Sequence, residues 1–169
     1  MKFSSVRRSA LPTAILGFAV LAMVSTPAFA TTQTTTFAVT ATVQGSCTIS
    51  ATALSFGAYT GTALPGTSTV SVNCTGGTTY NVGLNPGLAT GATVTTRKMT
   101  GQYLGGSLAY SLFSNSGRTT NWGQTVGTDT VAGTGTGAAQ TLTVYGNIPA
   151  GTAPAADGYS DTITATITY

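Results

Sequence analysis

The last eight residues of the chain alternate strictly between two kinds of side chain. Isoleucine, alanine and tyrosine occupy one set of alternate positions, and threonine occupies the other. This alternation predicts a β-strand over 160–169 with one apolar face, because successive side chains of a strand point to opposite sides. The apolar face consists of Ile163, Ala165, Ile167 and Tyr169. A strand of this kind needs a sheet to cover that face.

A second alternating segment lies at residues 37–43, close to the other end of the expected mature chain. It places four apolar side chains on one face, at Phe37, Val39, Ala41 and Val43. The sequence shows no further strand after residue 169, so the last strand is expected at an open sheet edge. The two segments are therefore interpreted as the donor and acceptor parts of a subunit that polymerises.

Residues 1–30 have the pattern of an export signal. Three basic residues precede an apolar stretch over 11–24, and the small-x-small sequence Ala28-Phe29-Ala30 follows it. A membrane anchor is the alternative, but the stretch is shorter than the roughly 20 residues that span a bilayer, and it contains Pro12. Cleavage is predicted to leave a mature chain that begins at Thr31 and has no membrane span.

Removal of the signal changes the charge of the protein. The residues from 31 onward keep three cations and three carboxylates, so the formal net charge of the mature chain is zero. They are Arg97, Lys98 and Arg118 against Asp129, Asp157 and Asp161. No basic patch of the kind that binds nucleic acid or anionic lipid is left. A neutral chain instead tolerates self-association, because its copies do not repel one another.

The mature chain is rich in threonine and glycine and lacks segments of helical period. β-Branched threonine favours strands, and glycine favours turns. Candidate strands cover 47–54, 69–74, 80–84, 95–103, 108–113 and 140–145. Turns are predicted at 65–66, 76–77 and 85–87, and a loop over 127–139. The length suits one domain, and the predicted fold class is an all-β sandwich with Greek-key connections.

The two cysteines, Cys47 and Cys74, are predicted to form a disulfide, because an exported chain meets an oxidising compartment. The loop between them corresponds to about 3–4 kcal/mol of stabilisation in the chain-entropy account. A metal pair or a redox centre is disfavoured, because the chain has no CxxC motif and no histidine.

The reactive side chains argue against catalysis. The mature chain has no histidine and no glutamate, and Lys98 is the only conceivable amine for acid–base or nucleophilic work. Asp157 and Asp161 are too few for a calcium site, and Asp161 is expected to orient the turn before the last strand. The stretch 133–137 lacks the Gly-Lys-Ser/Thr of a phosphate loop and is interpreted as a flexible turn. The sequence thus predicts no enzyme, cofactor or metal.

Aromatic residues divide into two groups. The tyrosines fall mostly on candidate strands, and packing in the core or on a sheet is the default expectation for them. They are Tyr59, Tyr80, Tyr103, Tyr110, Tyr145, Tyr159 and Tyr169. Trp122 lies next to Asn121 and near Arg118, and it is a candidate surface contact of the kind that binds sugars. Its assignment stays open.

Several short motifs together resemble the spore coat protein U domain family, which includes subunits of Csu-type pili from the archaic branch of the chaperone–usher pathway. In chain order they are the alternating N-terminal segment leading into Gly45-Ser46-Cys47, then Phe56-Gly57-x-Tyr59, Val70-x-Val-x-Cys74, Arg97-x-Met99, Leu108-x-Tyr110, Trp122-Gly123, Tyr145-Gly146-x-Ile148-Pro149 and Gly158-Tyr159-x-Asp161-Thr162. The resemblance covers 31–169. Many relatives have an acidic residue after the Trp-Gly pair, where this chain has Gln124, so no role of that loop is carried over.

The resemblance implies an immunoglobulin-like β-sandwich that lacks its last strand. In the family, a periplasmic chaperone lends a strand to the open groove, and an outer-membrane usher exchanges it for the N-terminal strand of the next subunit. On this sequence the donor side chains are Phe37, Val39, Ala41 and Val43, and the acceptor groove is lined by Ile163, Ala165, Ile167 and Tyr169. The implied organisation is a signal peptide over 1–30, a donor strand and linker over 31–45, and the sandwich domain over 46–169.

The predicted function is that of a secreted structural subunit of a surface pilus or fibre that supports adhesion and biofilm formation. It would pass through the periplasm to the cell surface, with neighbouring copies or related subunits, a chaperone and an usher as partners. The main alternative is a self-completed spore or cyst coat or carbohydrate-binding sandwich, because only residues 44–46 separate the donor segment from Cys47 and could form a hairpin. A tip adhesin is less favoured, because that role carries an additional domain in the family.

Overall fold

The computed structural model describes residues 27–151 and 154–169. It divides into two units, 1–40 and 41–169. In the first unit, the described residues 27–40 have no regular secondary structure. The predicted signal peptide lies outside the described residues except for 27–30, and the domain limits drawn from the sequence stay predictions.

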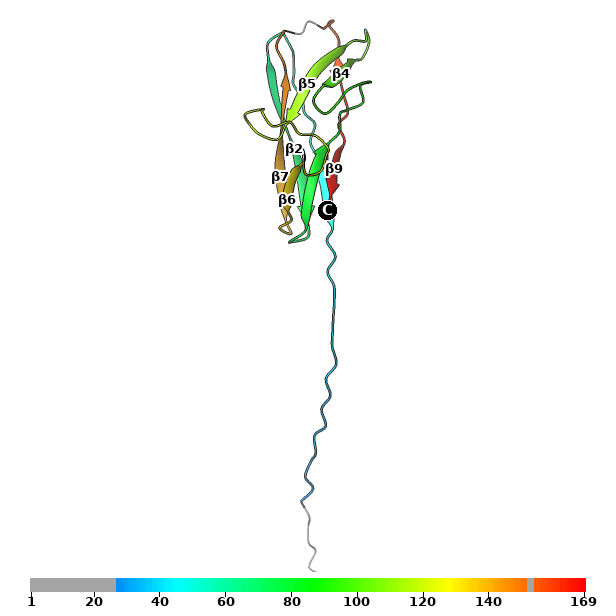
Figure 1. The fold of residues 1–169 in the computed structure, drawn as a ribbon, viewed down its shortest axis with the longest axis vertical. Helices are drawn as coiled ribbons and strands as arrows, with labels where there is room; N and C mark the ends of the chain where they lie inside the picture. Colours follow the sequence, from blue (N-terminus) through cyan, green and yellow to red (C-terminus); the bar gives the residue numbers. More distant parts are fainter. Residues whose placement is uncertain (1–26, 152–153) are drawn as a thin grey trace, which may run out of the picture. The chain divides into compact units, whose positions relative to one another are not determined.

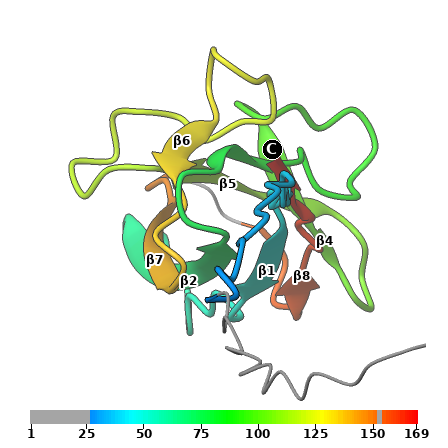
Figure 2. The ribbon, with the colours of Figure 1, turned by 90° about the horizontal axis from the view of Figure 1, so that it is seen from below.

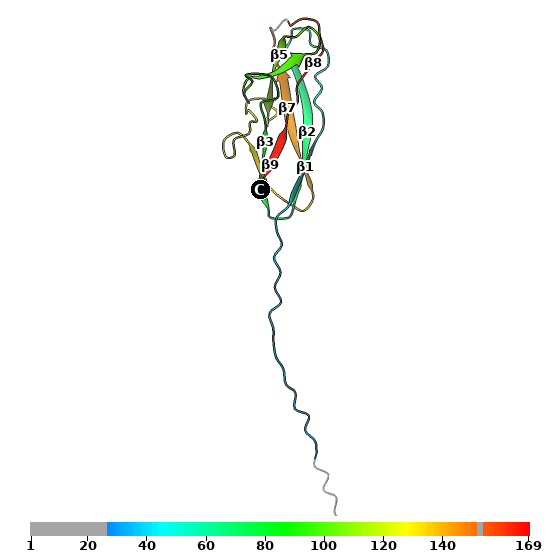
Figure 3. The ribbon, with the colours of Figure 1, turned by 90° about the vertical axis from the view of Figure 1, so that its right-hand side faces the viewer.

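The second unit is built from β-strands joined by turns and loops. The strands found among the described residues are β1 (Cys47–Ala51), β2 (Leu64–Cys74), β3 (Thr79–Leu84), β4 (Arg97–Gly101), β5 (Ser107–Phe113), β6 (Val131–Thr134), β7 (Ala139–Ile148), β8 (Tyr159–Ser160) and β9 (Ala165–Thr168). They form one sheet in the order β1-β2-β7-β5-β4-β8 and a second in the order β6-β3-β9. Figure 3 shows β2 and β7 on one side of this unit and β3 and β9 on the other, and Figure 1 shows β9 away from β7. The predicted all-β sandwich is confirmed.

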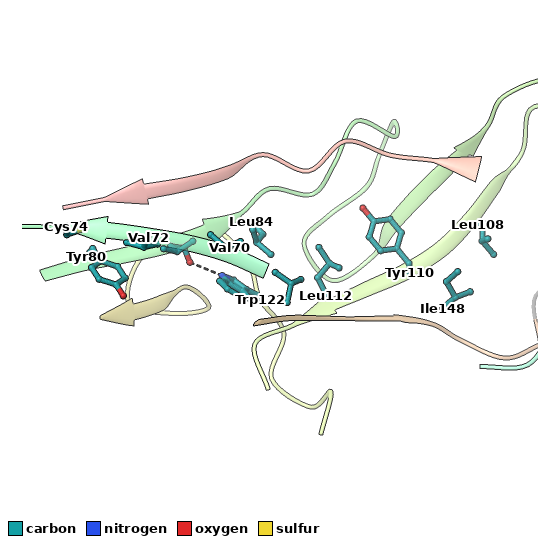
Figure 4. Packing of buried hydrophobic residues seen from close by; sticks show 12 residues of the cluster. Val70, Val72, Cys74, Tyr80, Leu84, Leu108, Tyr110, Leu112, Trp122 and Ile148 are labelled. Carbon is teal, nitrogen blue, oxygen red and sulfur yellow. Dashed lines mark hydrogen bonds between the residues drawn. The ribbon is translucent and has the colours of Figure 1, made fainter. Parts of the chain in front are cut away.

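The core lies between the two sheets. Alternate residues of β2 and β3 are buried, as their sequence pattern predicts, because each strand covers the core with one face. The buried apolar residues are Val70, Val72, Cys74, Tyr80, Val82, Leu84, Leu108, Tyr110, Leu112, Trp122, Val144 and Ile148. Figure 4 shows them spread along the space between the strands. Trp122, left open by the sequence, is therefore a core residue with 1% of its surface exposed.

The predicted disulfide between Cys47 and Cys74 is present. The two residues are directly opposite each other in the antiparallel pair of β1 and β2. The bond therefore fixes β1, which is the first strand of its sheet, to a strand in the interior of that sheet.

One predicted turn and one predicted loop are wrong. The turn expected at 65–66 lies inside β2, where Pro65 pairs with Asn147. Proline is tolerated there because β1 reaches only to position 70 of β2, which leaves this part of β2 at an edge. The loop expected over 127–139 contains β6, so the stretch 133–137 is not simply a flexible turn. A Cβ atom at Gly133 would collide with the ring of Tyr80, so this glycine makes room for a core side chain.

The strand expected over 160–169 is interrupted. β8 pairs with β4, and β9 pairs with β3, so the chain passes from one sheet to the other between Ser160 and Ala165. The strand expected over 95–103 is also shorter and ends at Gly101. Tyr103 consequently lies in the β4–β5 hairpin with 86% of its surface exposed, and its expected packing is wrong.

Candidate functional site, an apolar groove

The two open sheets end in four edge strands, β1 and β8 in the larger sheet and β6 and β9 in the smaller one. Among the described strands, β1 pairs only with β2, and β9 pairs only with β3. β1 and β9 nevertheless lie in contact with each other. Figure 2 shows the six-stranded sheet curling, and Figure 3 shows β1 and β8, the two ends of its strand order, at opposite ends of this unit along its long axis. Open edges present backbone N–H and C=O groups that lack a neighbouring strand.

A cavity of about 390 Å³ lies between these edges. One wall is the segment that continues β1, residues 51–56, and the other wall runs from β8 into β9, residues 159–165. Core side chains from the remaining strands form the floor, namely Val70, Leu84, Met99, Tyr110, Leu112 and Val144. The hydrophobic core therefore extends to the opening between the two walls.

A second cavity, of about 810 Å³, continues the first one. Both cavities are lined by Leu54, Phe56, Met99 and Tyr159. The second cavity extends further along the chain segments 57–61 and 154–158. The two cavities together are called the acceptor groove below.

The first wall of the acceptor groove is held against the six-stranded sheet by close packing. Gly66 of β2 is opposite Gly146 of β7 in the sheet. A Cβ atom at Gly146 would lie 2.8 Å from side-chain carbons of Leu54 and Phe56, and one at Gly66 would lie 3.0 Å from Phe56. The paired glycines thus allow the two apolar side chains to lie directly on the sheet. At the start of this wall, the Thr52 N–H donates to Thr69 O at 2.9 Å.

The second wall is held by Asp161. Its Oδ1 atom accepts hydrogen bonds from the backbone N–H groups of Leu88 and Thr162, both at 2.8 Å. Its Oδ2 atom accepts one from the Tyr110 hydroxyl at 2.6 Å. Gly87 has a left-handed φ of 91°, and a Cβ atom there would collide with the Asp161 carboxylate. Asp161 orients the turn before the last strand, as expected, and it also reaches the floor of the groove.

Asn85 fixes the same wall a few residues further on. Its N–H donates to Thr164 O at 3.1 Å, and its Oδ1 atom accepts from the Thr164 N–H at 2.9 Å. These bonds show that the N–H and C=O groups of Thr164 point toward the β3 side. The backbone groups of successive residues in a strand point to opposite sides. The N–H and C=O groups of Ile163, Ala165 and Ile167 then point toward the open edge.

Beneath the groove lies a buried cation. Arg97 has no exposed surface and donates to four backbone carbonyl oxygens, those of Leu84, Asn85, Val94 and Trp122, at 2.7–2.9 Å. Burial lowers its pKa from the ordinary arginine value. The pKa of Tyr110 is raised, chiefly by burial and then by its hydrogen bond to Asp161. Tyr110 therefore stays neutral and keeps donating to the carboxylate at ordinary pH.

Trp122 is in contact with this buried cation, because Arg97 donates to its carbonyl oxygen. Its indole N–H donates to Val82 O at 2.8 Å, the dashed line in Figure 4. Its backbone N–H donates to Leu112 O at 2.9 Å. The indole and the backbone N–H groups of Trp122 thus both donate hydrogen bonds inside the sandwich.

The four predicted acceptor side chains differ in their surroundings. Ile163 and Ala165 line the cavity between the walls. Ile167 packs against the core beyond that cavity. Tyr169 has 60% of its surface exposed. Their role in receiving a strand stays a prediction.

The four predicted donor side chains are exposed. Phe37, Val39 and Val43 have exposed fractions of 84%, 83% and 84%, and Ala41 is exposed as well. Residues 37–43 have no regular secondary structure. Their role as donor residues also stays a prediction.

Sequence reasoning missed most of the first wall and the floor. Leu54 and Phe56 alternate with small or polar residues and could have been recognised as one apolar face. Met99 and Tyr110 lie on strands that were predicted, but only the topology brings them beneath the opening. Within 27–151 and 154–169, there is no cluster of three or more side chains suited to a metal ion. In the same part of the chain, no helix has the length and apolar character needed to cross a membrane.

Three comparisons place this geometry among known proteins. The family model described as Spore Coat Protein U domain matches residues 33–166. "Protein U" of Myxococcus xanthus is 34% identical over 159 residues, which cover 85% of this chain and 88% of that protein. A chain in the crystal structure of the CsuC–CsuE chaperone–tip adhesion subunit pre-assembly complex, from archaic chaperone–usher Csu pili of Acinetobacter baumannii, superimposes with a TM-score of 0.56 at 26% identity. That match covers 76% of this chain and 41% of the structural relative, so this chain spans less than half of its length.

Proposed function

The chain belongs to the Spore Coat Protein U domain family, and on this basis we propose that it is a structural subunit of a chaperone–usher surface fibre. The family match confirms the resemblance that its sequence motifs indicate. The all-β sandwich is similar to a chain of the Csu pilus complex, which supports the assignment at the level of the fold.

The acceptor groove is the observation that carries this proposal. It lies between two open strand edges, and its floor consists of core side chains. A single added strand laid between the segments 51–56 and 159–165 would offer hydrogen bonds to both walls and cover the floor. Residues 37–43 of a second copy have suitable chemistry, because their apolar side chains recur about every 6.6 Å along an extended strand.

The energy of this association is large compared with the stability of a domain. Burying Phe37 and the two valines contributes roughly 5–8 kcal/mol before ordering costs, at about 1.5–3 kcal/mol for each side chain. A domain of this size is stable by about 5–15 kcal/mol in total. A subunit with an empty groove is therefore poorly stable and prone to aggregate. Temporary occupation of the groove by another protein gives such a subunit a route to assembly.

The partners follow from the same argument. The structural relative is named as part of a chaperone–subunit pre-assembly complex. By analogy, we propose that a periplasmic chaperone occupies the groove of this chain and that an outer-membrane usher catalyses its replacement by residues 37–43 of the next copy. The assembled fibre would lie at the cell surface and support adhesion and biofilm formation.

Val39→Asp tests the donor assignment. A carboxylate at this position would have to enter an apolar groove without a partner, which is strongly unfavourable. We expect secreted wild-type protein to give a ladder on an unboiled denaturing gel that collapses to monomer on boiling. Val39→Asp should give no ladder while its export continues. Thr40→Asp is the matched control, because it adds the same charge on the opposite face of the segment, and it should keep the ladder. A normal ladder from Val39→Asp would contradict the donor assignment.

Self-completion is the second candidate function. Only residues 44–46 lie between the donor segment and β1, which is short enough for a hairpin. Such a domain would be a stable monomer and would serve as a coat or binding module. A monomer in every unboiled wild-type lane would favour this candidate over the fibre.

A further inference from the structure

The second wall of the acceptor groove is not a regular strand. Between β8 and β9 the chain leaves one sheet and joins the other, and residues 161–164 belong to neither. Asp161, Thr162 and Ile163 nevertheless line the cavity. In the absence of a donor, this segment has no sheet neighbour on its groove side, so something else must set its position.

Asp161 supplies three fixed contacts at this point. One carboxylate oxygen binds the wall itself, through the Thr162 N–H, and the turn after β3, through the Leu88 N–H. The other oxygen binds the hydroxyl of Tyr110, a residue of the groove floor that is 5% exposed. Hydrogen bonds to an ionised group are the stronger kind, so the wall and the floor are firmly connected.

Tyr110 extends this connection to the opposite wall. Its ring meets that of Phe56 edge to face, with the ring centroids 6.3 Å apart and the planes at 62°. Phe56 in turn rests on the paired glycines of β2 and β7. One continuous series of contacts therefore runs from the first wall, across the floor, to Asp161 in the second wall.

We propose that Asp161 is a positioning residue for strand capture, which holds the second wall of the acceptor groove at the separation that an incoming strand requires. This inference rests on the proposed function, because it assumes that the groove receives a strand. A site that is set before its ligand arrives binds faster and loses less conformational freedom on binding. Once a donor strand lies in the groove, the hydrogen bonds between that strand and the second wall hold the wall in place. Asp161 then matters for capture more than for retention.

The test measures capture of a donor peptide by the full-length chain. The chain carries Val39→Asp in every arm, so that its own donor segment does not compete. The probe is a fluorescently labelled synthetic peptide with the sequence of residues 33–46. Association and dissociation rates are measured separately by stopped flow and by chase with unlabelled peptide, and thermal unfolding is recorded for each variant.

Three substitutions at the contact are compared with one control. Asp161→Ala should slow association by about tenfold or more, because it removes three hydrogen bonds to a charged acceptor. Tyr110→Phe keeps the ring and removes one of the three, so association should slow by about threefold or more. Asp161→Asn should restore association to within about threefold, because an amide accepts from both N–H groups and donates to the Tyr110 oxygen. Dissociation should change by less than about twofold in all three.

Asp129→Ala is the matched control. Asp129 also holds a loop, by accepting from the Thr125 N–H at 2.7 Å, but it does not line the acceptor groove. Its loss should lower the unfolding temperature and leave association unchanged. Equal slowing by Asp129→Ala would mean that association merely follows stability, which would overturn the inference.

The remaining outcomes separate the inference from the proposed function. If the Val39→Asp chain with an intact groove binds no peptide, the proposed function fails. If it binds peptide and neither Asp161→Ala nor Tyr110→Phe slows association, only the positioning role fails. Should Asp161→Ala not fold, Tyr110→Phe and Asp161→Asn decide the question, because normal association in Tyr110→Phe contradicts the series of contacts from wall to floor.

Discussion

Arg97 is a cation with no exposed surface, in a chain whose described part has few charges of either sign. A buried charge is costly unless its hydrogen-bonding groups are satisfied. Here the planar guanidinium donates to four carbonyl oxygens from three separate segments of chain. It thereby joins β4 of one sheet to the end of β3 in the other. The sequence motif Arg97-x-Met99 indicated the family but gave no sign of this role.

Arg97→Lys should therefore be strongly destabilising although it keeps the charge. An ammonium group cannot reach all four oxygens in the same geometry, and each buried acceptor left without a donor costs about 1–3 kcal/mol. We expect a loss of about 3 kcal/mol or more in the free energy of unfolding, measured by urea denaturation. Arg118→Lys is the control at a half-buried loop position and should cost less than about 1 kcal/mol. Equal losses in the two variants would contradict the role of the four carbonyl contacts.

Asp157 makes the β4–β5 hairpin sensitive to acid. Its carboxylate accepts from the N–H groups of Leu104, Tyr103 and Gly158 at 2.8, 2.9 and 2.7 Å. These bonds, that of Leu104 first, lower the pKa of Asp157 below its usual value. A group whose pKa is lower in the folded state stabilises that state above its unfolded pKa of about 3.9, and the effect is lost as the pH falls through the lower folded value.

We therefore expect the amide resonances of Tyr103 and Leu104 to shift in acid, as the hydrogen bonds to Asp157 break. A titration by NMR from about pH 6 to pH 2 would show this, with a midpoint below the ordinary aspartate pKa. Asp157→Asn removes the titrating group and should abolish the shift. A midpoint at or above the ordinary value would show that the carboxylate is not held by these amides.

Single residues also show where sequence reasoning worked. The alternation of Val70, Val72 and Cys74 correctly predicts one buried face, because the period of a strand fixes which side chains share a side. Glycine was less informative, because it has two physical uses. It permits unusual backbone angles, which favours turns, and it permits close packing, which is its use at Gly133 beneath Tyr80. The sequence does not distinguish the two.

Among the strands, β1 depends most on a covalent bond. It has five residues and one sheet neighbour, and Cys47 is its first residue. Cys47→Ser with Cys74→Ser should reduce the free energy of unfolding by about 3–4 kcal/mol, as expected for a loop of this length. The strand that borders the acceptor groove should fray first. Hydrogen exchange of the 47–51 amides measures this, and unchanged protection there would contradict it.

The interrupted last strand shows what alternation cannot predict. Threonine and apolar residues alternate without a break from 162 to 169, and the side chains of Ile163 and Ala165 do face the interior. The change of sheet depends on contacts with distant parts of the chain, chiefly Asn85 and Tyr110. Local pattern therefore gives the correct faces of an element, while its partners and its interruptions follow from tertiary contacts.

Taken whole, the proposed subunit has one donor segment and one acceptor groove. Contacts of this head-to-tail kind build open chains rather than closed pairs. A copy that accepts but cannot donate can then stand only at the first position of a chain, so it should start additional and therefore shorter chains. We expect Val39→Asp, expressed together with the wild type in increasing proportion, to shorten the ladder on unboiled gels progressively. Thr40→Asp at the same proportions should leave its length unchanged. A ladder that loses intensity without shortening would contradict a linear head-to-tail polymer.

The position of the disulfide has a mechanical consequence for such a fibre. Any pull transmitted between neighbouring copies would enter a subunit along residues 44–46 and reach the folded part at Cys47, the first residue of β1. Without a crosslink, the load would peel β1 from β2 one hydrogen bond at a time. Because Cys47 is bonded to Cys74, the force passes directly into β2, which lies between β1 and β7 in the larger sheet. In the proposed fibre, the covalent bond would carry the tension at the point where the subunit would otherwise begin to unravel.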